Sequence, residues 1–267
     1  MVDDRSSQTW SNTEAYEAIM GRWSRPAAQA ALEWLALPPD LAWLDVGCGT
    51  GALTQAILET ASPSEVLGVD PSAEFLALAA EEIQDPRVHF ETGSAQSLPV
   101  EDDRFDVTIS GLVLHFVPDH KASAVEMTRA ARRGGVVAAH IWDVDDERQF
   151  TRPFWRASRE VDPGVSAWDP LVQFSVRGIE ALSEAWTAAG LREVTVTGIS
   201  IPIVFRDFDD YWQPCLLDGT TPIQRYATSL GAQQQRVLGE HLRTVLPTAA
   251  DGSITLSGRL LIVRGTK

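Results

Sequence analysis

The chain has 267 residues, of which 44% are hydrophobic and 22% are charged, and its formal net charge at pH 7 is −15. This length and composition predict a folded globular protein with one large domain and exclude a disordered chain. The negative charge disfavours general nucleic-acid binding, because a phosphate backbone would be repelled. We find no apolar run of roughly 18 residues and no signal-peptide core, so we expect a cytoplasmic protein with no membrane partner.

The chain begins with two predicted amphipathic helices, at residues 13–20 and 26–36. Pro38-Pro39 ends the second helix. An apolar strand follows at residues 41–46, and a glycine-rich turn then leads into a helix from Ala52. This order of strand, glycine turn and helix is typical of nucleotide-binding proteins with a parallel sheet.

Strands and helices continue to alternate along the next hundred residues. Further strands are predicted at residues 66–69, 88–91, 105–110 and 136–142. Ser72 and Asp119 are suited to cap the helices between them, and Gly134-Gly135 is suited to end the helix before the last of these strands. Alternation with short connections predicts a parallel sheet with helices on both faces.

The C-terminal part has a different pattern. A helix is predicted between Ser175, as its cap, and Gly190. Two long alternating segments, 193–205 and 253–263, then predict an antiparallel pair at the sheet edge, with a bulge at Gly198. We therefore expect an α/β fold with a Rossmann-like, mostly parallel seven-stranded sheet, a final antiparallel strand and a helical cap formed by insertions.

The insertions at residues 143–174 and 206–251 are too long for simple loops and are rich in aromatic side chains. Their aromatic residues either bind an acceptor or form a satellite core. We expect a single domain over residues 1–267. The core is assigned to residues 37–142, 175–205 and 252–267, and the cap to residues 1–36, 143–174 and 206–251.

The glycine turn, Gly47-Cys48-Gly49-Thr50-Gly51, lets a ligand approach the backbone closely. A dinucleotide fingerprint has a related glycine spacing. Asp45 favours another ligand, because a carboxylate would repel pyrophosphate but attract an ammonium or sulfonium group. Asp70 follows Gly51 by 19 residues and is placed to accept hydrogen bonds from a ribose. A positively charged nucleoside is therefore predicted.

Four segments together resemble the ordered motifs of class I S-adenosylmethionine-dependent methyltransferases, most closely the ubiquinone/menaquinone-biosynthesis-like group that acts on small molecules. The segments are Leu44–Gly51, Val66–Ser72, Gly93–Pro99 and Phe105–Ser110. The resemblance covers residues 14–142 and implies S-adenosyl-L-methionine as the cofactor. It says little about the acceptor.

The resemblance also implies which residues contact the cofactor. These residues are Asp45, Gly47, Cys48, Gly49, Asp70, Pro71, Ser72, Ser94, Ala95, Gln96, Ser110, Gly111 and Leu112. Many relatives have aspartate where this chain has Ser94, so the bond to the adenine amine falls to serine or to the Ala95 backbone. An N-terminal helix in relatives supplies an aromatic ring and an arginine, which points to Tyr16 and Arg25. Their alternative role is to anchor the first helix at the surface.

Methyl transfer requires alignment of acceptor, methyl and sulfur more than it requires a base. His115 and His140 are the candidate bases, and for each a structural role is the alternative. The expected acceptor-binding residues are Trp142, Asp143, Phe154, Trp155, Trp168, Tyr211 and Trp212. The turn after the fourth strand lacks the Pro-Pro-aromatic motif of nucleic-acid amino methyltransferases.

Cys48 and Cys215 lack metal-type spacing, and we expect no metal. We expect a small-molecule acceptor and no nucleic-acid partner, and a homodimer is compatible with the sequence. Three other functions stay open: a non-catalytic cofactor-binding sensor, a non-methylating enzyme that uses the same cofactor, and a dinucleotide-dependent oxidoreductase.

Overall fold

The computed structural model describes residues 13–146, 148–168, 176–219 and 221–267. The chain divides into two compact units. The sheet unit consists of Ser24–Asp143, Ser175–Ile199 and Leu260–Lys267, and the helical unit consists of Met1–Trp23, Val144–Phe174 and Ser200–Arg259. The assignment of the whole chain to one domain with a core and a cap stays a prediction.

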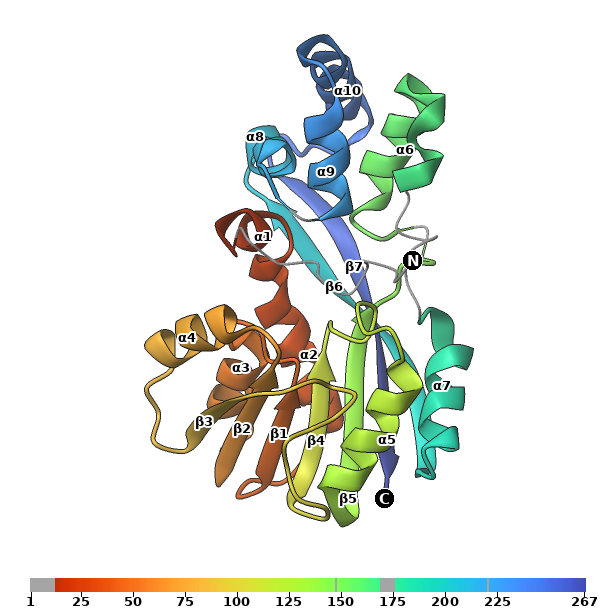
Figure 1. The fold of residues 1–267 in the computed structure, drawn as a ribbon. Helices are drawn as coiled ribbons and strands as arrows, with labels where there is room; N and C mark the ends of the chain where they lie inside the picture. The colour runs from red at the N-terminus through yellow and green to blue at the C-terminus, as the bar shows by residue number, and fades with distance from the viewer. Residues whose placement is uncertain (1–12, 147, 169–175, 220) are drawn as a thin grey trace, which may run out of the picture. The chain divides into compact units, whose positions relative to one another are not determined.

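The seven strands form one sheet in the order β3-β2-β1-β4-β5-β7-β6 (Figure 1). Their bounds are β1 Ala42–Val46, β2 Glu65–Asp70, β3 Val88–Thr92, β4 Phe105–Gly111, β5 Ala131–Trp142, β6 Arg192–Phe205 and β7 Ile254–Thr266. The pairs β1–β2, β2–β3, β1–β4 and β4–β5 are parallel, and β7 runs antiparallel to β5. The predicted mostly parallel sheet with a final antiparallel strand is confirmed.

Strand β1 lies where the strand order reverses. The chain passes from β1 outward to β2 and β3, and then returns to β4 on the other side of β1. Crevices for ligands in such sheets lie beyond the carboxyl ends of the strands at this point. The turn after Val46 is therefore at the position where the fold itself provides a binding site.

Helices cover both faces of the sheet unit. They are α2 Ser24–Leu35, α3 Ala52–Thr60, α4 Ala73–Glu82, α5 His120–Ala130 and α7 Gly178–Ala188. Ser72 accepts a hydrogen bond from the Phe75 N–H and Asp119 accepts one from the Ala122 N–H, so both predicted caps are confirmed. The α7 helix has Arg177 in the N-cap position, and Ser175 lies outside the described residues.

The alternation of side chains along β1 separates two apolar cores. Leu44 and Val46 belong to the core that contains side chains of α5 and α7. Trp43 belongs to the other core, together with Leu32 of α2 and Ile57 of α3. Period-two alternation produces this division, because successive side chains of a strand point to opposite faces. Asp45 therefore faces α3, in a layer that is otherwise apolar.

The predicted helix stop at Gly134-Gly135 is wrong. The α5 helix already ends at Ala130, and both glycines lie inside β5. Phe105 pairs with Ala131 but Val107 pairs with Val136, so β5 contains a bulge in which Gly134 has φ +77°. A Cβ on Gly135 would lie 2.8 Å from the Arg132 carbonyl oxygen, which explains the need for glycine there.

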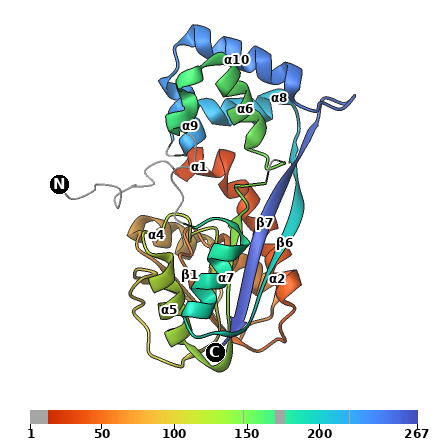
Figure 2. The same ribbon diagram turned by 90° about the vertical axis from the view of Figure 1, so that its right-hand side faces the viewer.

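The helical unit is built mainly from the two insertions. Its helices are α1 Thr13–Ile19, η2 Gly21–Trp23, α6 Arg152–Val161, η3 Pro163–Trp168, α8 Phe208–Trp212, η5 Gln213–Leu216, α9 Pro222–Ser229 and α10 Ala232–Val245. Figure 2 shows α6 beside α10, and the two helices are in contact. No helix in the described part of the chain has the length and apolar character needed to cross a bilayer.

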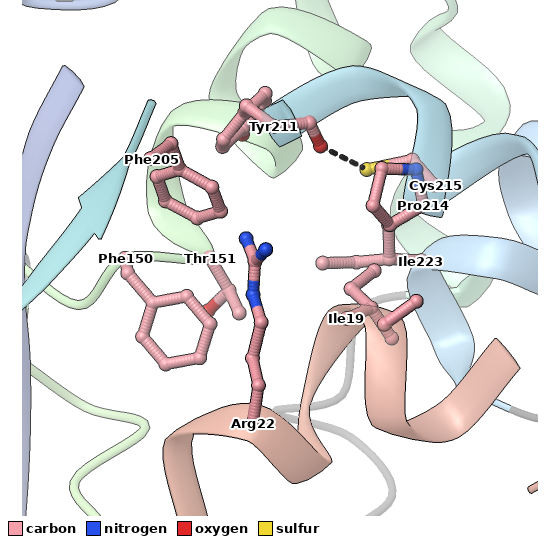
Figure 3. Close-up of a pocket in the computed structure, with 10 residues that line it drawn as sticks. Ile19, Arg22, Phe150, Thr151, Phe205, Tyr211, Pro214, Cys215 and Ile223 are labelled. Carbon is pink, nitrogen blue, oxygen red and sulfur yellow. Dashed lines mark hydrogen bonds between the residues drawn. The ribbon is translucent and has the colours of Figure 1, made fainter. Parts of the chain in front are cut away.

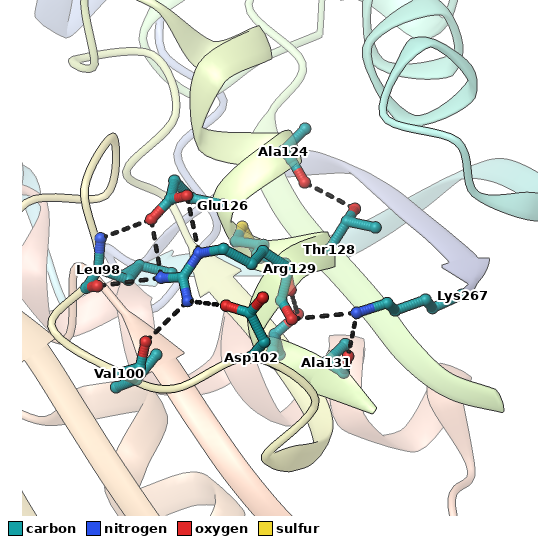
Figure 4. A network of polar contacts seen from close by, with 11 residues as sticks. Leu98, Val100, Asp102, Ala124, Glu126, Thr128, Arg129, Ala131 and Lys267 are labelled. Atoms are coloured by element: carbon teal, nitrogen blue, oxygen red, sulfur yellow. Dashed lines mark hydrogen bonds and ion pairs between the residues drawn. The ribbon is translucent and has the colours of Figure 1, made fainter. Parts of the chain in front are cut away.

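Arg129 and Arg132, which are close together in the sequence, take part in the internal bonding of the sheet unit, and Figure 4 shows the contacts of Arg129. The guanidinium of Arg129 donates to the carbonyl oxygens of Leu98 and Val100 at 3.0 and 2.7 Å, and it pairs with Glu126 and Asp102. Figure 4 also shows Lys267, which donates to the carbonyl oxygens of Arg129 and Ala131. Arg132 pairs with Asp106. These contacts attach the loop before β4 to α5.

We predict that Arg129→Met lowers the free energy of unfolding by about 2–3 kcal/mol, because two carbonyl oxygens and two carboxylates lose their donor. Urea denaturation measures this change. The control is Arg133→Met, which removes an exposed guanidinium nearby and is expected to change stability by less than about 0.5 kcal/mol. Equal effects of the two substitutions would contradict the structural role of Arg129.

Candidate functional site

The turn after β1 is fixed by one carbonyl group at the end of β2. The N–H groups of Gly47 and Cys48 both donate to the Val69 oxygen, at 2.7 and 3.1 Å. Gly47, Gly49 and Gly51 have φ values of +76°, +54° and +90°. Side chains rarely adopt this left-handed conformation, so the alternating glycines allow the turn to fold back on the sheet.

The glycines differ in what surrounds them. A Cβ on Gly47 would lie 2.6 Å from Val113, and one on Gly51 would lie 2.6 Å from Ile83. A Cβ on Gly49 would meet no atom within 4 Å. Gly47 and Gly51 are therefore required by close packing, whereas the backbone at Gly49 borders open space that a ligand can enter.

Asp45 is a fully buried carboxylate beneath this turn. Its Oδ2 accepts a hydrogen bond of 2.7 Å from Thr54 Oγ1 on α3, while its Oδ1 has no partner among the described residues. Burial raises the pKa of Asp45 to about 7, against the opposing effect of the Thr54 bond. A cation near Oδ1 would satisfy the carboxylate and favour its ionised form.

Asp70 binds the turn from the end of β2. Its Oδ2 accepts from the Gly49 N–H at 3.0 Å and its Oδ1 accepts from the Ser72 N–H at 2.8 Å. Burial raises the pKa of Asp70, although both main-chain N–H groups act in the opposite direction. A carboxylate has about four acceptor sites, so Asp70 retains the capacity to bind ribose hydroxyls.

The predicted cofactor fits this arrangement. An ammonium group would satisfy the unpartnered oxygen of Asp45. The open space beside Gly49 leaves room for the ligand, and Asp70 can accept hydrogen bonds from ribose hydroxyls. Thr54 was missed by the sequence analysis. Its signal was a polar residue beside Leu53, Ala56 and Ile57, which are all on the buried face of α3.

The other predicted cofactor contacts lie around the same sheet edge, with different exposures. Pro71 and Ser94 are exposed, and Ser94 Oγ accepts from the Gln96 N–H at 3.2 Å. Ala95 is buried in the apolar core, which leaves its backbone as the group for a ligand. The buried Ser110 hydroxyl donates to the Val46 oxygen at 2.8 Å. It therefore bonds to β1. Burial also raises the pKa of the Cys48 thiol, which makes it a weak nucleophile at neutral pH.

Gly111, Leu112 and His140 form one packed group at the end of β4. A Cβ on Gly111 would lie 2.8 Å from Cε1 of His140. The next residue, Leu112, has φ +61° and donates its N–H to the His140 oxygen at 2.8 Å. His140 is 1% exposed, its Nδ1 has no partner among the described residues, and burial lowers its pKa to about 4.

His115 has a different environment from His140. Its Nδ1 lies 2.9 Å from the Val176 oxygen and its Nε2 lies 3.0 Å from the Trp142 oxygen. A neutral imidazole donates through only one nitrogen, and both of these neighbours are acceptors. This geometry favours the structural alternative for His115, in which the ring connects the end of β5 to the start of the α7 segment.

The two N-terminal candidates are only partly described. Tyr16 belongs to α1, but its side chain lies outside the described part of the chain. Arg25 pairs with Glu82 at 3.6 Å, and both side chains are about two-thirds exposed, at 67% and 65%. This pairing is the surface contact that the alternative predicts. A role of either residue in cofactor binding stays a prediction.

The predicted acceptor-binding aromatics of the helical unit pack mostly against one another. Phe154, Trp155 and Trp212 are buried, and Phe154 makes ring contacts with both tryptophans at 5.2 and 6.5 Å. Tyr226 joins them and also contacts Trp168 at 6.2 Å. This is the satellite core that the sequence left as the alternative. In the sheet unit, Trp142 and Asp143 are buried at the end of β5.

A small cavity lies beside this cluster within the helical unit (Figure 3). Tyr211 is the only predicted acceptor-binding residue among its described lining residues. The other lining residues are Ala18, Ile19, Arg22, Phe150, Thr151, Phe205, Pro214, Cys215 and Ile223. Sequence analysis missed these residues. The signal for Arg22 was the aromatic and basic segment Met20-Gly-Arg-Trp-Ser-Arg25, in which Arg25 was chosen instead.

The family described as "Methyltransferase domain" matches residues 44–139. The chain is 36% identical to a demethylmenaquinone methyltransferase of Lysinibacillus sphaericus, over 63% of this chain and 77% of that protein. The chain belongs to the class I S-adenosylmethionine-dependent methyltransferase family. The matched residues include the β1 turn, Asp70 and the end of β4 described above.

Two further comparisons show how far this chain resembles known proteins. An uncharacterised protein of Mycobacterium tuberculosis is 34% identical over 48% of this chain, and the match spans about half, 46%, of that relative. The crystal structure of YcgJ from Bacillus subtilis superposes with a TM-score of 0.59 at 19% identity, over 91% of this chain and 98% of that one. The latter likeness confirms the fold.

We predict that affinity for S-adenosylhomocysteine, which retains the ammonium group, rises as pH increases from 6 to 8. The cause is ionisation of Asp45, whose pKa is about 7. Asp45→Asn should weaken binding about tenfold or more at pH 8 and remove the pH dependence. Isothermal titration calorimetry measures both effects. Glu74→Gln, which removes an exposed carboxylate of α4, is the control.

Asp45→Asn, which should weaken ligand binding, should increase the stability of the ligand-free protein. A carboxyl whose pKa is raised by folding loses stability as pH rises from the unfolded value of 3.8 towards the folded value of about 7. Without ligand at pH 8, Asp45→Asn should therefore unfold at a higher temperature than the wild type. A lower melting temperature, or wild-type affinity that is equal at pH 6 and pH 8, would contradict this explanation.

Proposed function

We propose that the protein transfers a methyl group from S-adenosylmethionine to a small-molecule acceptor. The observation that carries this proposal is the buried carboxylate of Asp45, which has one unpartnered oxygen beneath an open glycine turn. Pyrophosphate would be repelled there, so the dinucleotide alternative is disfavoured. Similarity to the Lysinibacillus demethylmenaquinone methyltransferase supports a small organic acceptor.

The cofactor, when bound, supplies a methyl group on a sulfonium that is a good leaving group. The chain's own residues then have to orient the two reactants and exclude water. Gly47 and Gly51 fix the turn by close packing, and Asp70 holds Gly49 in place. Alignment of this kind supplies roughly 7–11 kcal/mol in favourable cases. A general base is therefore an addition to the chemistry and not its main requirement.

We propose that the helical unit supplies the acceptor site and that the protein acts on its acceptor in the cytoplasm. Its small cavity, which is lined mainly by aliphatic and aromatic side chains, is suited to an apolar molecule. A nucleic-acid acceptor is disfavoured by the net charge of −15 and by the internal bonding of Arg129 and Arg132. The sensor and the non-methylating enzyme are the competing functions that the first experiment tests.

His140 is the stronger of the two candidate bases. Its buried Nδ1 has no hydrogen-bond partner among the described residues. An apolar side chain at this position would avoid the free-energy cost of that unsatisfied nitrogen. With a pKa of about 4, the ring is neutral at physiological pH, although it is a weaker base than an exposed imidazole. His115, in contrast, faces a carbonyl oxygen at each nitrogen.

We predict opposite effects of two substitutions. His140→Leu should lower kcat by about 10²–10⁴-fold with unchanged or increased stability, because it removes a base and an unsatisfied polar atom. His115→Leu should lower the free energy of unfolding by about 1–3 kcal/mol, because a buried carbonyl oxygen loses the imidazole N–H as its donor. Steady-state kinetics and urea denaturation separate these outcomes. Full activity of His140→Leu would exclude His140 as a base.

The function itself is tested with S-adenosylmethionine that carries a trideuterated methyl group. The purified protein is incubated with this cofactor and a metabolite extract of the source cells, and products are identified by mass spectrometry. We expect the label on a small molecule, and no transfer with Asp45→Asn at a cofactor concentration below saturation. Label on protein or nucleic acid would overturn the acceptor class, and tight binding without transfer would favour a sensor or a non-methylating enzyme.

A further inference from the structure

The cavity in the helical unit has mainly apolar walls and one charged side chain. Figure 3 shows Arg22 extending from the N-terminal helical segment into the space between Phe205, Tyr211 and Pro214. Ile19 and Ile223 line another side. Burial raises the pKa of Cys215 to about 12 and that of Tyr211 well above its usual value, so both are neutral at physiological pH. Arg22 therefore dominates the electrostatics of the described lining.

The guanidinium of Arg22 is held rigidly in this position. It stacks on the rings of Trp23 and Phe205, with its central carbon 4.5 and 4.8 Å from their centroids. Nη1 donates to Asp210 Oδ1 at 3.1 Å and Nη2 to the Asp210 carbonyl oxygen at 3.4 Å. Nε is buried and has no partner among the described residues. Two aromatic rings thus hold the planar guanidinium, and its Nε–H group remains available as a hydrogen-bond donor.

The carboxylate that pairs with Arg22 is shared with a second arginine. The same carboxylate also accepts from the Arg206 main-chain N–H at 3.0 Å and from the Arg206 guanidinium at 3.1 Å. Two guanidinium groups therefore share one carboxylate. Because a buried donor without a partner is costly, the unpartnered Nε of Arg22 beside the cavity indicates an absent acceptor of hydrogen bonds, for which an anionic group is the strongest candidate.

We propose that this cavity binds the carboxylate end of an apolar or aromatic acceptor, with Arg22 as the recognising group. The proposal rests on the proposed methyl transfer and adds the chemical class of the acceptor. Arginine is the side chain best suited to this task, because its planar fork matches the geometry of a carboxylate. The aromatic and aliphatic walls then contact the apolar body of the ligand.

The size of the cavity agrees with this assignment. Its volume is about 20 Å³, which is more than the 10–15 Å³ or so that one water molecule requires but far less than a whole acceptor needs. A carboxylate group would therefore enter as the end of a larger molecule. The cofactor also carries a carboxylate, and the experiment distinguishes this second source from the acceptor.

Binding of 4-fluorobenzoate and 4-fluorobenzamide to the full chain is compared by fluorine NMR titration. The two probes have almost the same shape and differ in charge. We expect the carboxylate to bind about tenfold more tightly than the amide. Arg22→Gln should remove this preference. Arg206→Gln, which removes an exposed guanidinium from the same carboxylate but lies outside the cavity lining, should retain it within about threefold.

Asp210→Asn gives the sharper test because Arg22 stays in place. It removes the internal carboxylate that competes with the ligand, so the preference for 4-fluorobenzoate should increase about tenfold. A purely structural ion pair between Arg22 and Asp210 would produce no such increase. Arg22→Lys, which retains the charge, keeps the test informative if Arg22→Gln does not fold, and it should show a reduced but measurable preference.

Affinity for S-adenosylhomocysteine is measured on the same variants and should change by less than about threefold in Arg22→Gln. A loss equal to that of 4-fluorobenzoate would assign the cavity to the cofactor carboxylate and overturn the proposal. Equal binding of the two fluorinated probes to the wild type would also overturn it. An intact carboxylate preference without methyl transfer by the wild type would exclude the proposed function and leave the carboxylate site standing.

Discussion

The carbonyl oxygen of Val69 is the acceptor on which the site depends. By binding the N–H groups of both Gly47 and Cys48, it turns the chain after β1 back over the end of β2. This brings Gly49 within reach of Asp70, which binds the turn a second time. The result is a rigid loop above a buried carboxylate, formed by two neighbouring strand ends and the helix that follows one of them. A parallel sheet makes such an arrangement at the strand where its order reverses.

This arrangement has an energetic cost that the rest of the fold must offset. Asp45 is buried with only one of its oxygens satisfied, and the three glycines of the turn lose more conformational entropy on folding than other residues would. The two apolar cores, on opposite faces of the sheet, supply the stabilisation that holds the turn in place. The site is thus poorly satisfied without ligand, and a cation that binds there relieves part of the cost.

The sequence predicted the sheet unit well because its strands, caps and glycine turn depend on residues that are close together in the chain. Ser72 and Asp119 cap the helices that follow them, and the glycine turn lies directly behind β1. The error at Gly134-Gly135 has a physical reason: a bulge depends on the register of the neighbouring strand, which one segment of sequence does not reveal. The catalytic and acceptor-binding roles, and the cofactor contacts of Tyr16 and Arg25, stay predictions.

The helical unit was less predictable, because its contacts join segments far apart in the sequence. Arg22 meets Asp210 across 188 positions, and no spacing rule connects them. The aromatic composition of the two insertions did not reveal which aromatic residues pack in a cluster and which line the cavity. Phe154 and Trp155 are in the cluster, whereas Phe150 lines the cavity only a few residues away.

The contact between Gly111 and His140 means that these positions can change only together. With an imidazole at position 140, any side chain at position 111 would overlap the ring. Leu112, in turn, adopts its left-handed conformation with its N–H on the His140 carbonyl. A lineage that loses the histidine would then need only a shift of the Leu53 side chain, 3.0 Å from a Cβ on Gly111, to place alanine or serine at position 111. Covariation of the two positions among relatives would record this packing constraint.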